Sequence, residues 1–181
     1  MQFVRSVVQR LWFTADTHFG HGRIIQYCNR PFKDFQHQDE EILRRFNEVI
    51  KPGDILYHLG DLSWSSYPLD KFFGRLNTKE VHLIWGNHDK EKRTVHPNIR
   101  SYSYIKNLHQ GNHHAVLCHY AMRSWLGKGH GSFQLYGHSH GRLPGEGRQM
   151  DVGVDTHDFY PYSWEEIQNK LGKIEFKENE E

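Results

Sequence analysis

Eight residues of the types that bind metals or transfer protons stand at the ends of five short apolar runs in this 181-residue chain. These residues are Asp16, His18, Asp61, Asn87, His88, His119, His138 and His140. Carboxylate, imidazole and amide together suit manganese, iron, zinc or similar ions, whereas calcium and magnesium prefer oxygen ligands alone. Even seven such ligands are too many for one catalytic ion that keeps a position open for water. The set therefore predicts two ions that share one bridging carboxylate.

The apolar runs that carry these residues are predicted to be buried strands. They are "LWFTADTH" (11–18), "DILYHLGD" (54–61), "VHLIWGNHD" (81–89), "HAVLCHY" (114–120) and "FQLYGHSH" (133–140). Each run is short, rich in β-branched or aromatic residues, and bounded by polar or turn-forming residues. Because α/β sheets bind ligands outside the carboxyl ends of their strands, the polar ends of these runs are the expected place for a site.

Three further segments carry helical patterns. Residues 39–50 place apolar side chains on one helical face, and residues 68–77 form a shorter candidate. Residues 163–171 open with a serine followed three positions later by glutamate, which is the capping-box pattern. Strands and helices that alternate along the chain predict an α/β fold. The segments predicted to be loops are 90–100, 123–133 and 141–149.

Length and composition narrow the class of protein. The length predicts a single domain over residues 1–181, with 1–10 interpreted as an extension of the first strand and 177–181 as a frayed tail. The net charge of +1 gives no basic surface for coating duplex nucleic acid. No apolar run reaches membrane-spanning length, so no membrane partner is expected. Two cysteines outside any CxxC pair are typical of reduced thiols, which favours a cytoplasmic location.

The five motifs, in their order along the chain, resemble those of the calcineurin-like metallophosphoesterase superfamily. "ADTHFGH", "LGD", "GNHD", "LCHY" and "GHSH" match its signature of D-x-H, G-D, G-N-H-[DE], H and G-H-x-H. In "DTHFGHGRIIQYCNRPF" and "HYAMRSW" the chain is most similar to small stand-alone phosphoesterases of bacteria and phages. The resemblance implies a four-layer α/β/β/α sandwich, in which two mixed β-sheets are flanked by helices.

The resemblance also implies a role for each site residue. The ligands of the first ion would be Asp16, His18, Asp61 and His140. The ligands that complete the second ion would be Asn87, His119 and His138, with Asp61 as the bridge. His88 would be a general acid or a substrate-positioning residue rather than a ligand. The two divalent ions would be manganese first, with iron, zinc, nickel or cobalt as alternatives.

The implied reaction is hydrolysis of a phosphate ester by metal-activated hydroxide. We expect a nucleotide-like phosphodiester as substrate, and a phosphomonoester is the alternative. Two other classes of protein stay open: a metal-binding protein that kept the fold without catalysis, and a structural zinc module. The intact set of site residues argues against the first, and the scarcity of cysteine argues against the second.

Candidates for substrate contact are weaker. His21 follows the first motif and could line the site, and Arg23, Arg30 and Arg123 could clamp a phosphate, because guanidinium matches phosphate geometry. For each arginine, a solvated side chain is the competing interpretation. His58 is expected to be a core histidine with a hydrogen-bond partner. The tryptophans, Trp12, Trp85 and Trp125 among them, are expected to anchor the core or loops rather than to stack on bases.

Overall fold

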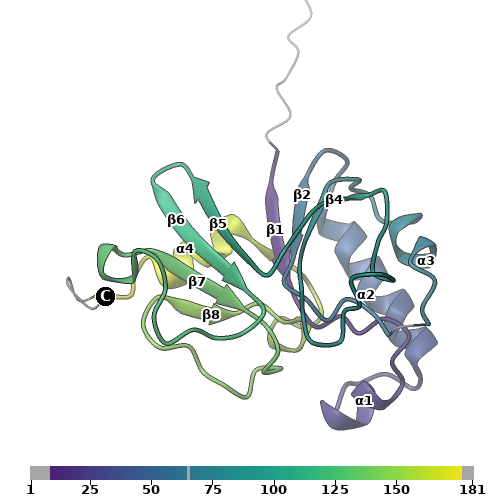
Figure 1. The fold of residues 1–181 in the computed structure, drawn as a ribbon. Helices are drawn as coiled ribbons and strands as arrows, with labels where there is room; N and C mark the ends of the chain where they lie inside the picture. Colours follow the sequence, from purple (N-terminus) through teal and green to yellow (C-terminus); the bar gives the residue numbers. More distant parts are fainter. Residues whose placement is uncertain (1–8, 65, 177–181) are drawn as a thin grey trace, which may run out of the picture.

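A computed structural model describes residues 9–64 and 66–176 (Figure 1). The predicted tail 177–181 and most of the predicted extension 1–10 lie outside the described residues. Of that extension, Gln9 and Arg10 are described, as exposed residues before the first strand.

The first sheet has five strands in the order β4-β3-β2-β1-β9. Its strands are β1 (Leu11–Thr14), β2 (Ile55–His58), β3 (Val81–Ile84), β4 (Ile99–Ser103) and β9 (Tyr162–Ser163). β1 to β4 pair in parallel, and β9 runs antiparallel to β1. The carboxyl ends of β1, β2 and β3 therefore lie at one edge of the sheet.

The second sheet has four strands in the order β5-β6-β7-β8. Its strands are β5 (Ile105–Gln110), β6 (His113–Cys118), β7 (Phe133–Tyr136) and β8 (Gln149–Asp151). β5 and β6 form an antiparallel hairpin, whereas β6, β7 and β8 are parallel. β6 and β7 thus also end at a common edge.

Within residues 9–64 and 66–176, four helices accompany the sheets, with two short 3-10 turns. They are α1 (Arg23–Tyr27), α2 (Phe35–Val49), α3 (Asp70–Phe73), α4 (Trp164–Leu171), η1 (Lys128–His130) and η2 (Val154–Thr156). α2 begins four residues before the predicted start because Asp34 caps it, accepting a hydrogen bond from the backbone N–H of His37 at 2.7 Å. The predicted capping box of α4 is confirmed, with Ser163 and Glu166 bonded reciprocally.

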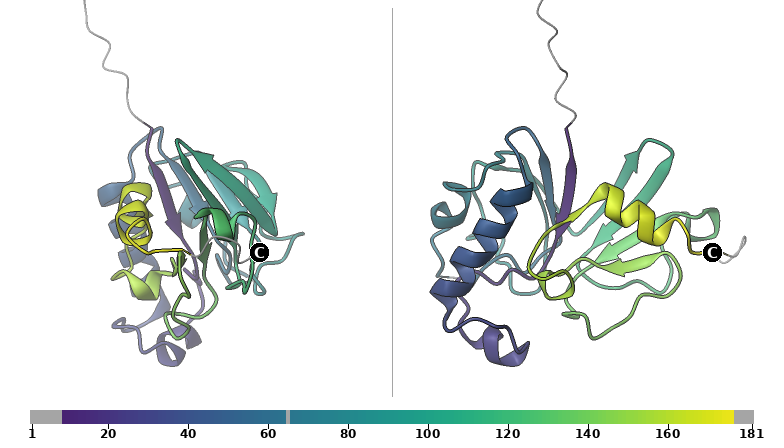
Figure 2. Two further views of the ribbon diagram at one scale, coloured as in Figure 1. Left: turned by 90° about the vertical axis from the view of Figure 1, so that its left-hand side faces the viewer. Right: turned by 180° about the vertical axis from the view of Figure 1, so that it is seen from behind.

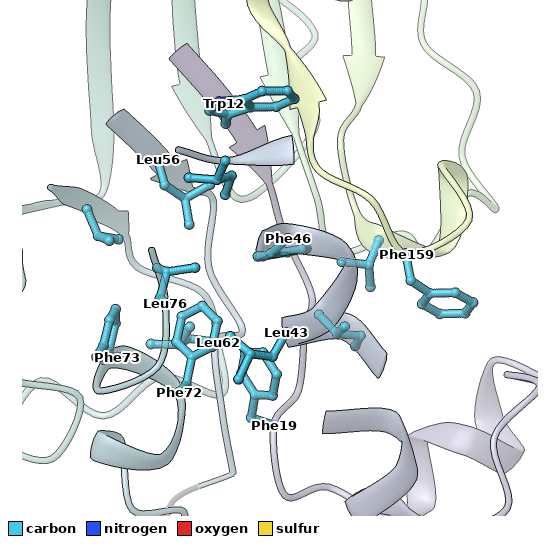
Figure 3. Packing of buried hydrophobic residues seen from close by; sticks show 14 of the residues in the cluster. Trp12, Phe19, Leu43, Phe46, Leu56, Leu62, Phe72, Phe73, Leu76 and Phe159 are labelled. Carbon is cyan, nitrogen blue, oxygen red and sulfur yellow. The ribbon is translucent and has the colours of Figure 1, made fainter. Parts of the chain in front are cut away.

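Two apolar clusters lie on opposite faces of the five-stranded sheet. Alternate residues of β1 point to opposite sides, so Trp12 joins one cluster and Phe13 the other. The first cluster is formed with α2 and α3 and contains Phe46 and Phe72 (Figure 3). The second fills the space between the sheets, where Trp164 of α4 contacts Phe13 and a phenylalanine of β7 with ring centroids 5.6 and 5.8 Å away. Figure 2 shows α2 and α4 on the same side of the molecule, where α2 covers the five-stranded sheet and α4 contacts both sheets.

The predicted fold of two mixed sheets flanked by helices is confirmed. The five predicted strands correspond to β1, β2, β3, β6 and β7, and each is shorter than its apolar run. The prediction of a loop over residues 90–100 was wrong at its end, where β4 begins with the buried Ile99. No helix among the residues placed by the structure is long and apolar enough to cross a membrane.

Candidate metal centre

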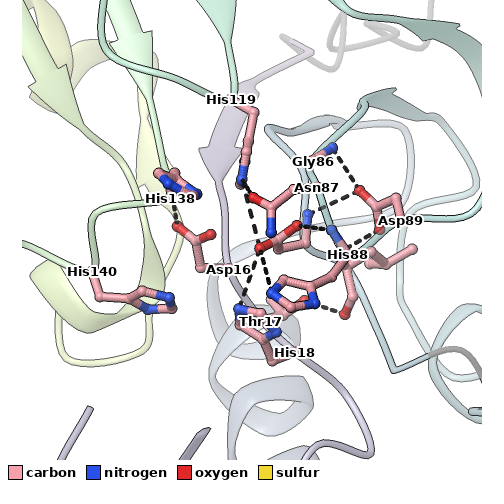
Figure 4. Close-up of polar contacts among 12 residues, drawn as sticks. Asp16, Thr17, His18, Gly86, Asn87, His88, Asp89, His119, His138 and His140 are labelled. Atoms are coloured by element: carbon pink, nitrogen blue, oxygen red, sulfur yellow. Dashed lines mark hydrogen bonds and ion pairs between the residues drawn. The ribbon is translucent and has the colours of Figure 1, made fainter. Parts of the chain in front are cut away.

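All seven predicted ligands lie where the carboxyl ends of the two sheets meet (Figure 4). The segments after β1, β2 and β3 bring one half of the set, and those after β6 and β7 bring the other. In Figure 4, His119, His138 and His140 point from the four-stranded side toward Asp16 and His18. The site is therefore assembled between the sheets rather than within one of them.

The ligand atoms form two groups, each compact enough for one ion. Asp16, His18 and His140 make the first, with all their ligand atoms within 4.8 Å of one another. Asp61, His119 and His138 make the second under the same limit. This division matches the sets that the sequence motifs imply.

Asp61, a member of the second group, also faces the first. Its Oδ2 atom is 3.6 Å from Nε2 of His18 in the first group and 3.6 Å from Nε2 of His119 in the second. Its Oδ1 atom accepts a hydrogen bond from the backbone N–H of His88 at 2.8 Å, which fixes the carboxylate. A carboxylate held at this point can serve two ions at once.

Several buried polar atoms at the site have no hydrogen-bond partner among the described residues. They are Oδ1 of Asp16 and both ring nitrogens of His18, and the two side chains are 0% and 1% exposed. A buried polar atom without a partner costs free energy, so such groups are rare unless something else binds them. A divalent ion binds carboxylate oxygens and imidazole nitrogens that lie close together and have no other partner. These residues therefore fit a metal ion.

The second group also has electron-pair donors that face each other with no proton between them. Nδ1 of His119 donates to the carbonyl of Leu59 at 2.7 Å, and burial lowers the pKa of this histidine against the opposing charge of Asp61. The neutral ring therefore presents a bare Nε2 lone pair to Oδ1 of Asn87, 3.2 Å away. Two acceptors facing each other repel, and an ion bound by both removes the repulsion.

The protonation of the first group depends on burial and on neighbouring charge. Burial raises the pKa of Asp16 well above its usual value, and burial, with the charge of Arg30, lowers the pKa of His18. Burial is the largest single influence on His140 and opposes its charged form, but the hydrogen bonds to Asp155 and Cys28 and the charges of Asp16 and Asp155 together raise its pKa to about 10. A divalent ion beside these groups would act in the opposite direction on His140, since it carries charge of the same sign as the imidazolium.

The backbone at the site is strained. Eight described residues other than glycine have positive φ angles, and five of them are predicted ligands. Those five are Asp16 (58°), His18 (51°), Asp61 (55°), His138 (67°) and His140 (50°). Left-handed conformations are unfavourable for residues with a Cβ and gather at functional sites, where the surrounding structure enforces them.

Comparison with known families identifies the chain. Residues 10–153 match the model of the calcineurin-like phosphoesterase superfamily domain. The chain belongs to this superfamily. The match covers every predicted ligand and all strands except β9, so the family predicted from the motifs is confirmed.

Three relatives illustrate the range of this chain's similarities. MJ1445 of Methanocaldococcus jannaschii is 38% identical over 85 residues, which cover 46% of this chain and 48% of that protein, about half its length. The gene 66 protein of Mycobacterium phage D29 is 25% identical over 93% of this chain and 98% of its own. The solved structure of AQ665 from Aquifex aeolicus, described as of unknown function, superposes with a TM-score of 0.75 at 24% identity over 90% of this chain and all of that one.

Arg30 has a structural role, whereas the sequence suggested either a phosphate clamp or a solvated side chain. The side chain is buried, and Nε and Nη2 each donate to Asp155 at 2.8 Å. Asp155 in turn accepts from Nδ1 of His140 at 2.7 Å, which leaves Nε2 of that ring for an ion. Arg30 also donates to the backbone carbonyl of Asp16 at 2.7 Å. Arg30 is therefore neither a phosphate clamp nor a solvated side chain, because it is buried and its donors are already used to hold the predicted ligands.

Asp89 joins two motif loops. Its carboxylate, which is buried, accepts backbone hydrogen bonds from Asp61 and Gly86 at 2.9 Å and from Leu62 at 3.0 Å. Burial raises its pKa to about 6 against these hydrogen bonds. The final residue of "GNHD" thus fixes the position of the bridging carboxylate, a role that the sequence did not reveal. His58, as predicted, is buried and has a partner, the Thr17 hydroxyl at 2.9 Å.

Gly137 allows the "GHSH" segment to approach Asp16. A Cβ atom at position 137 would lie 2.4 Å from Cβ of Ala15 and 2.7 Å from Oδ2 of Asp16. That approach lets the backbone N–H of His138 donate to the same carboxylate oxygen at 2.9 Å. The two sheets can be joined at this point only through a residue that lacks a side chain.

Gly137→Ala is therefore expected to separate the two ligand groups. The backbone must shift because Ala15 has no rotamer to change, and we expect metal affinity to fall by at least ~10-fold. Metal content after dialysis against a fixed manganese concentration measures the effect. Gly111→Ala is the control: a Cβ there meets nothing within 4 Å and the turn is far from the site, so the strain of its φ of 59° should lower stability without moving a ligand. Equal metal content in both variants would contradict the role of Gly137.

A cleft of about 720 Å³ opens beside the metal ligands on the His88 side. Its lining includes His21 and Arg23, two of the predicted substrate contacts, together with His88. The His88 side chain is 42% exposed, with Nε2 4.0 Å from Oδ2 of Asp61. Arg123 is exposed and lies outside the described lining of this cleft, so its substrate contact stays a prediction.

Trp64 also lines this cleft and is 42% exposed. The prediction that tryptophans anchor the core or loops is confirmed for Trp12 and Trp125, which are buried. Trp64 is not buried, and its ring is stacked on His21 with centroids 4.3 Å apart, so for Trp64 the choice between a loop anchor and a base-stacking ring stays a prediction. Its position in a polar loop gave no periodic signal that would have separated it from the others.

Proposed function

We propose that this phosphoesterase hydrolyses a nucleotide-like phosphodiester with two divalent transition-metal ions, of which manganese is the first choice. The observation that supports two ions is the position of Asp61, whose Oδ2 is equally distant from His18 and His119. One ion would be held by Asp16, His18, Asp61 and His140. The other would be held by Asp61, Asn87, His119 and His138.

The ions, when bound, would supply charge that polarises the phosphoryl group and a nucleophile from water. The protein's own part is then to orient the ligands and to manage the leaving group. Arg30 and Asp155 hold His140, and the Leu59 carbonyl holds His119. His88, exposed at the rim, is placed to donate a proton to the departing oxygen.

A phosphomonoester is the second candidate. It needs only the ions and a phosphate pocket, whereas a diester needs room for a second ester group. The cleft beside His88 offers that room, and this favours the diester. His21 and Arg23 would contact the substrate from its wall. A cytoplasmic location and a small phosphate-ester substrate complete the proposal.

Metal titration tests the proposal most directly. We expect metal-free protein reconstituted with manganese to bind close to two equivalents and to hydrolyse bis-p-nitrophenyl phosphate faster than p-nitrophenyl phosphate. Asp54→Asn provides a control. Asp54 is buried just before β2, away from the motif loops, and its carboxylate accepts a hydrogen bond from the Trp12 indole. The Asp54→Asn protein should still bind two equivalents of manganese. One equivalent with full activity would contradict the two-ion site. Two equivalents without hydrolysis of any ester would favour a metal-binding protein without catalysis.

A further inference from the structure

The cleft beside His88 exposes several aromatic rings to one space. Tyr27, Phe35 and Trp64 line it and are 59%, 36% and 42% exposed. Large apolar side chains are normally buried, and exposed ones gathered in a concave place mark a ligand site. The three rings come from the end of α1, the start of α2 and the loop after β2, so no single segment explains their meeting.

The aromatic wall continues to the metal ligands. The rings of His21 and Trp64 are stacked, with centroids 4.3 Å apart and planes inclined by 20°. His21 lies 5.4 Å from the ring of His18 and 6.2 Å from that of His88. A planar group on this wall would therefore lie next to the reacting phosphate.

Polar groups on the same cleft can contact the edges of a planar ligand. Arg23 and Gln26 are exposed and belong to the lining. The guanidinium donates hydrogen bonds, and the amide can both donate and accept. Rings for stacking, with donors and an acceptor beside them, are the features that bind a nucleobase. The volume of about 720 Å³ lies within the range of small-molecule sites.

The position of His88 shows on which side of the phosphate the nucleobase would lie. His88 lines the cleft and is the proton donor in the proposed function. The oxygen that receives its proton belongs to the leaving alcohol, so the leaving alcohol must lie in the cleft. We propose that the cleft binds the leaving-group half of the substrate, and that this half carries a nucleobase stacked on Trp64. This inference rests on the proposed function.

The products follow from that orientation. A water oxygen forms the new bond to phosphorus, and the electron pair of the broken phosphorus–oxygen bond goes to the leaving oxygen. Nε2 of His88 gives its proton to that oxygen, and the proton lost by water restores the histidine through solvent. The products are a nucleoside with a free hydroxyl and a phosphomonoester of the other half.

The first test measures binding without hydrolysis. Calorimetric titration of the manganese-reconstituted protein with adenosine, and separately with ribose, should show binding of adenosine only. Trp64→Ala should weaken adenosine binding about 10-fold or more, as for loss of a base-stacking ring, and Trp64→Phe should restore most of it. The control is Tyr104→Ala, which removes a 64% exposed ring outside the cleft. Equal binding of adenosine and ribose, or no effect of Trp64→Ala, would overturn the inference.

The second test identifies the products. The methyl phosphodiester of the adenosine 5′-oxygen should yield adenosine and methyl phosphate, and Trp64→Ala should raise its KM about 10-fold. The matching ribose diester should show no such change. Adenosine monophosphate and methanol would place the base on the opposite side and overturn the orientation. Adenosine binding that depends on Trp64, without hydrolysis of this diester or of bis-p-nitrophenyl phosphate, would support the cleft as a nucleoside site and reject the proposed function instead.

Discussion

Asp61→Ala is expected to abolish turnover of every phosphate ester and to weaken the binding of both metal ions. The Oδ2 atom of Asp61 lies 3.6 Å from Nε2 of His18 and of His119, so one carboxylate supplies charge to both ligand groups. Without it, two like charges would be held close together with no shared counter-charge. Loss of a group that only supports a ligand costs about 10–100-fold in metal affinity or activity, and loss of the bridge should exceed that.

The measurement for Asp61→Ala is metal content together with kcat/KM on a nitrophenyl diester. Asp54→Ala is the matched control, because it also removes a buried aspartate flanking β2 that accepts backbone hydrogen bonds. It should cost stability but keep both ions and most of the activity. Near-normal activity of Asp61→Ala would show that another residue bridges the ions.

His88→Ala is expected to retain both ions and to lose activity in proportion to how much the leaving group needs a proton. Nε2 of His88 lies 4.0 Å from Asp61, and the side chain is 42% exposed at the rim of the cleft, so the ring can reach a departing oxygen. General acid catalysis is worth about 10²–10⁴-fold. An alkoxide such as a ribose oxygen requires that proton, whereas a nitrophenolate leaves without it.

The quantity to measure is the ratio of wild-type to His88→Ala kcat across a series of diesters whose leaving groups rise in pKa. The ratio should increase along the series. A constant ratio with both ions present would reject the general-acid role and leave His88 as a residue that positions the phosphate. Loss of an ion in this variant would mean that His88 is a ligand or supports one.

The sequence was sufficient to predict which seven candidate ligands the fold brings together, because each follows an apolar run whose carboxyl end is a recognisable motif. The sequence was not sufficient to predict the side chains that position these residues through hydrogen bonds. Arg30 and Asp155 are 125 residues apart, and nothing local to either predicts their contact. The same holds for the three backbone hydrogen bonds that Asp89 accepts. β8 and β9 are too short to carry a period, and Trp64 differs from the buried tryptophans only through tertiary packing.

The left-handed conformations of five predicted ligands lower the thermodynamic stability of the protein. Each such conformation costs of the order of 1–3 kcal/mol in a residue with a Cβ, and glycine adopts it without that cost. The burial of Asp16 and His18 without partners adds to the cost in the metal-free protein. Natural proteins are only marginally stable, so a lineage released from selection for catalysis would gain stability by discarding these side chains. Substitutions at the left-handed residues of the candidate metal centre should therefore raise the stability of the metal-free protein while removing its predicted ligands.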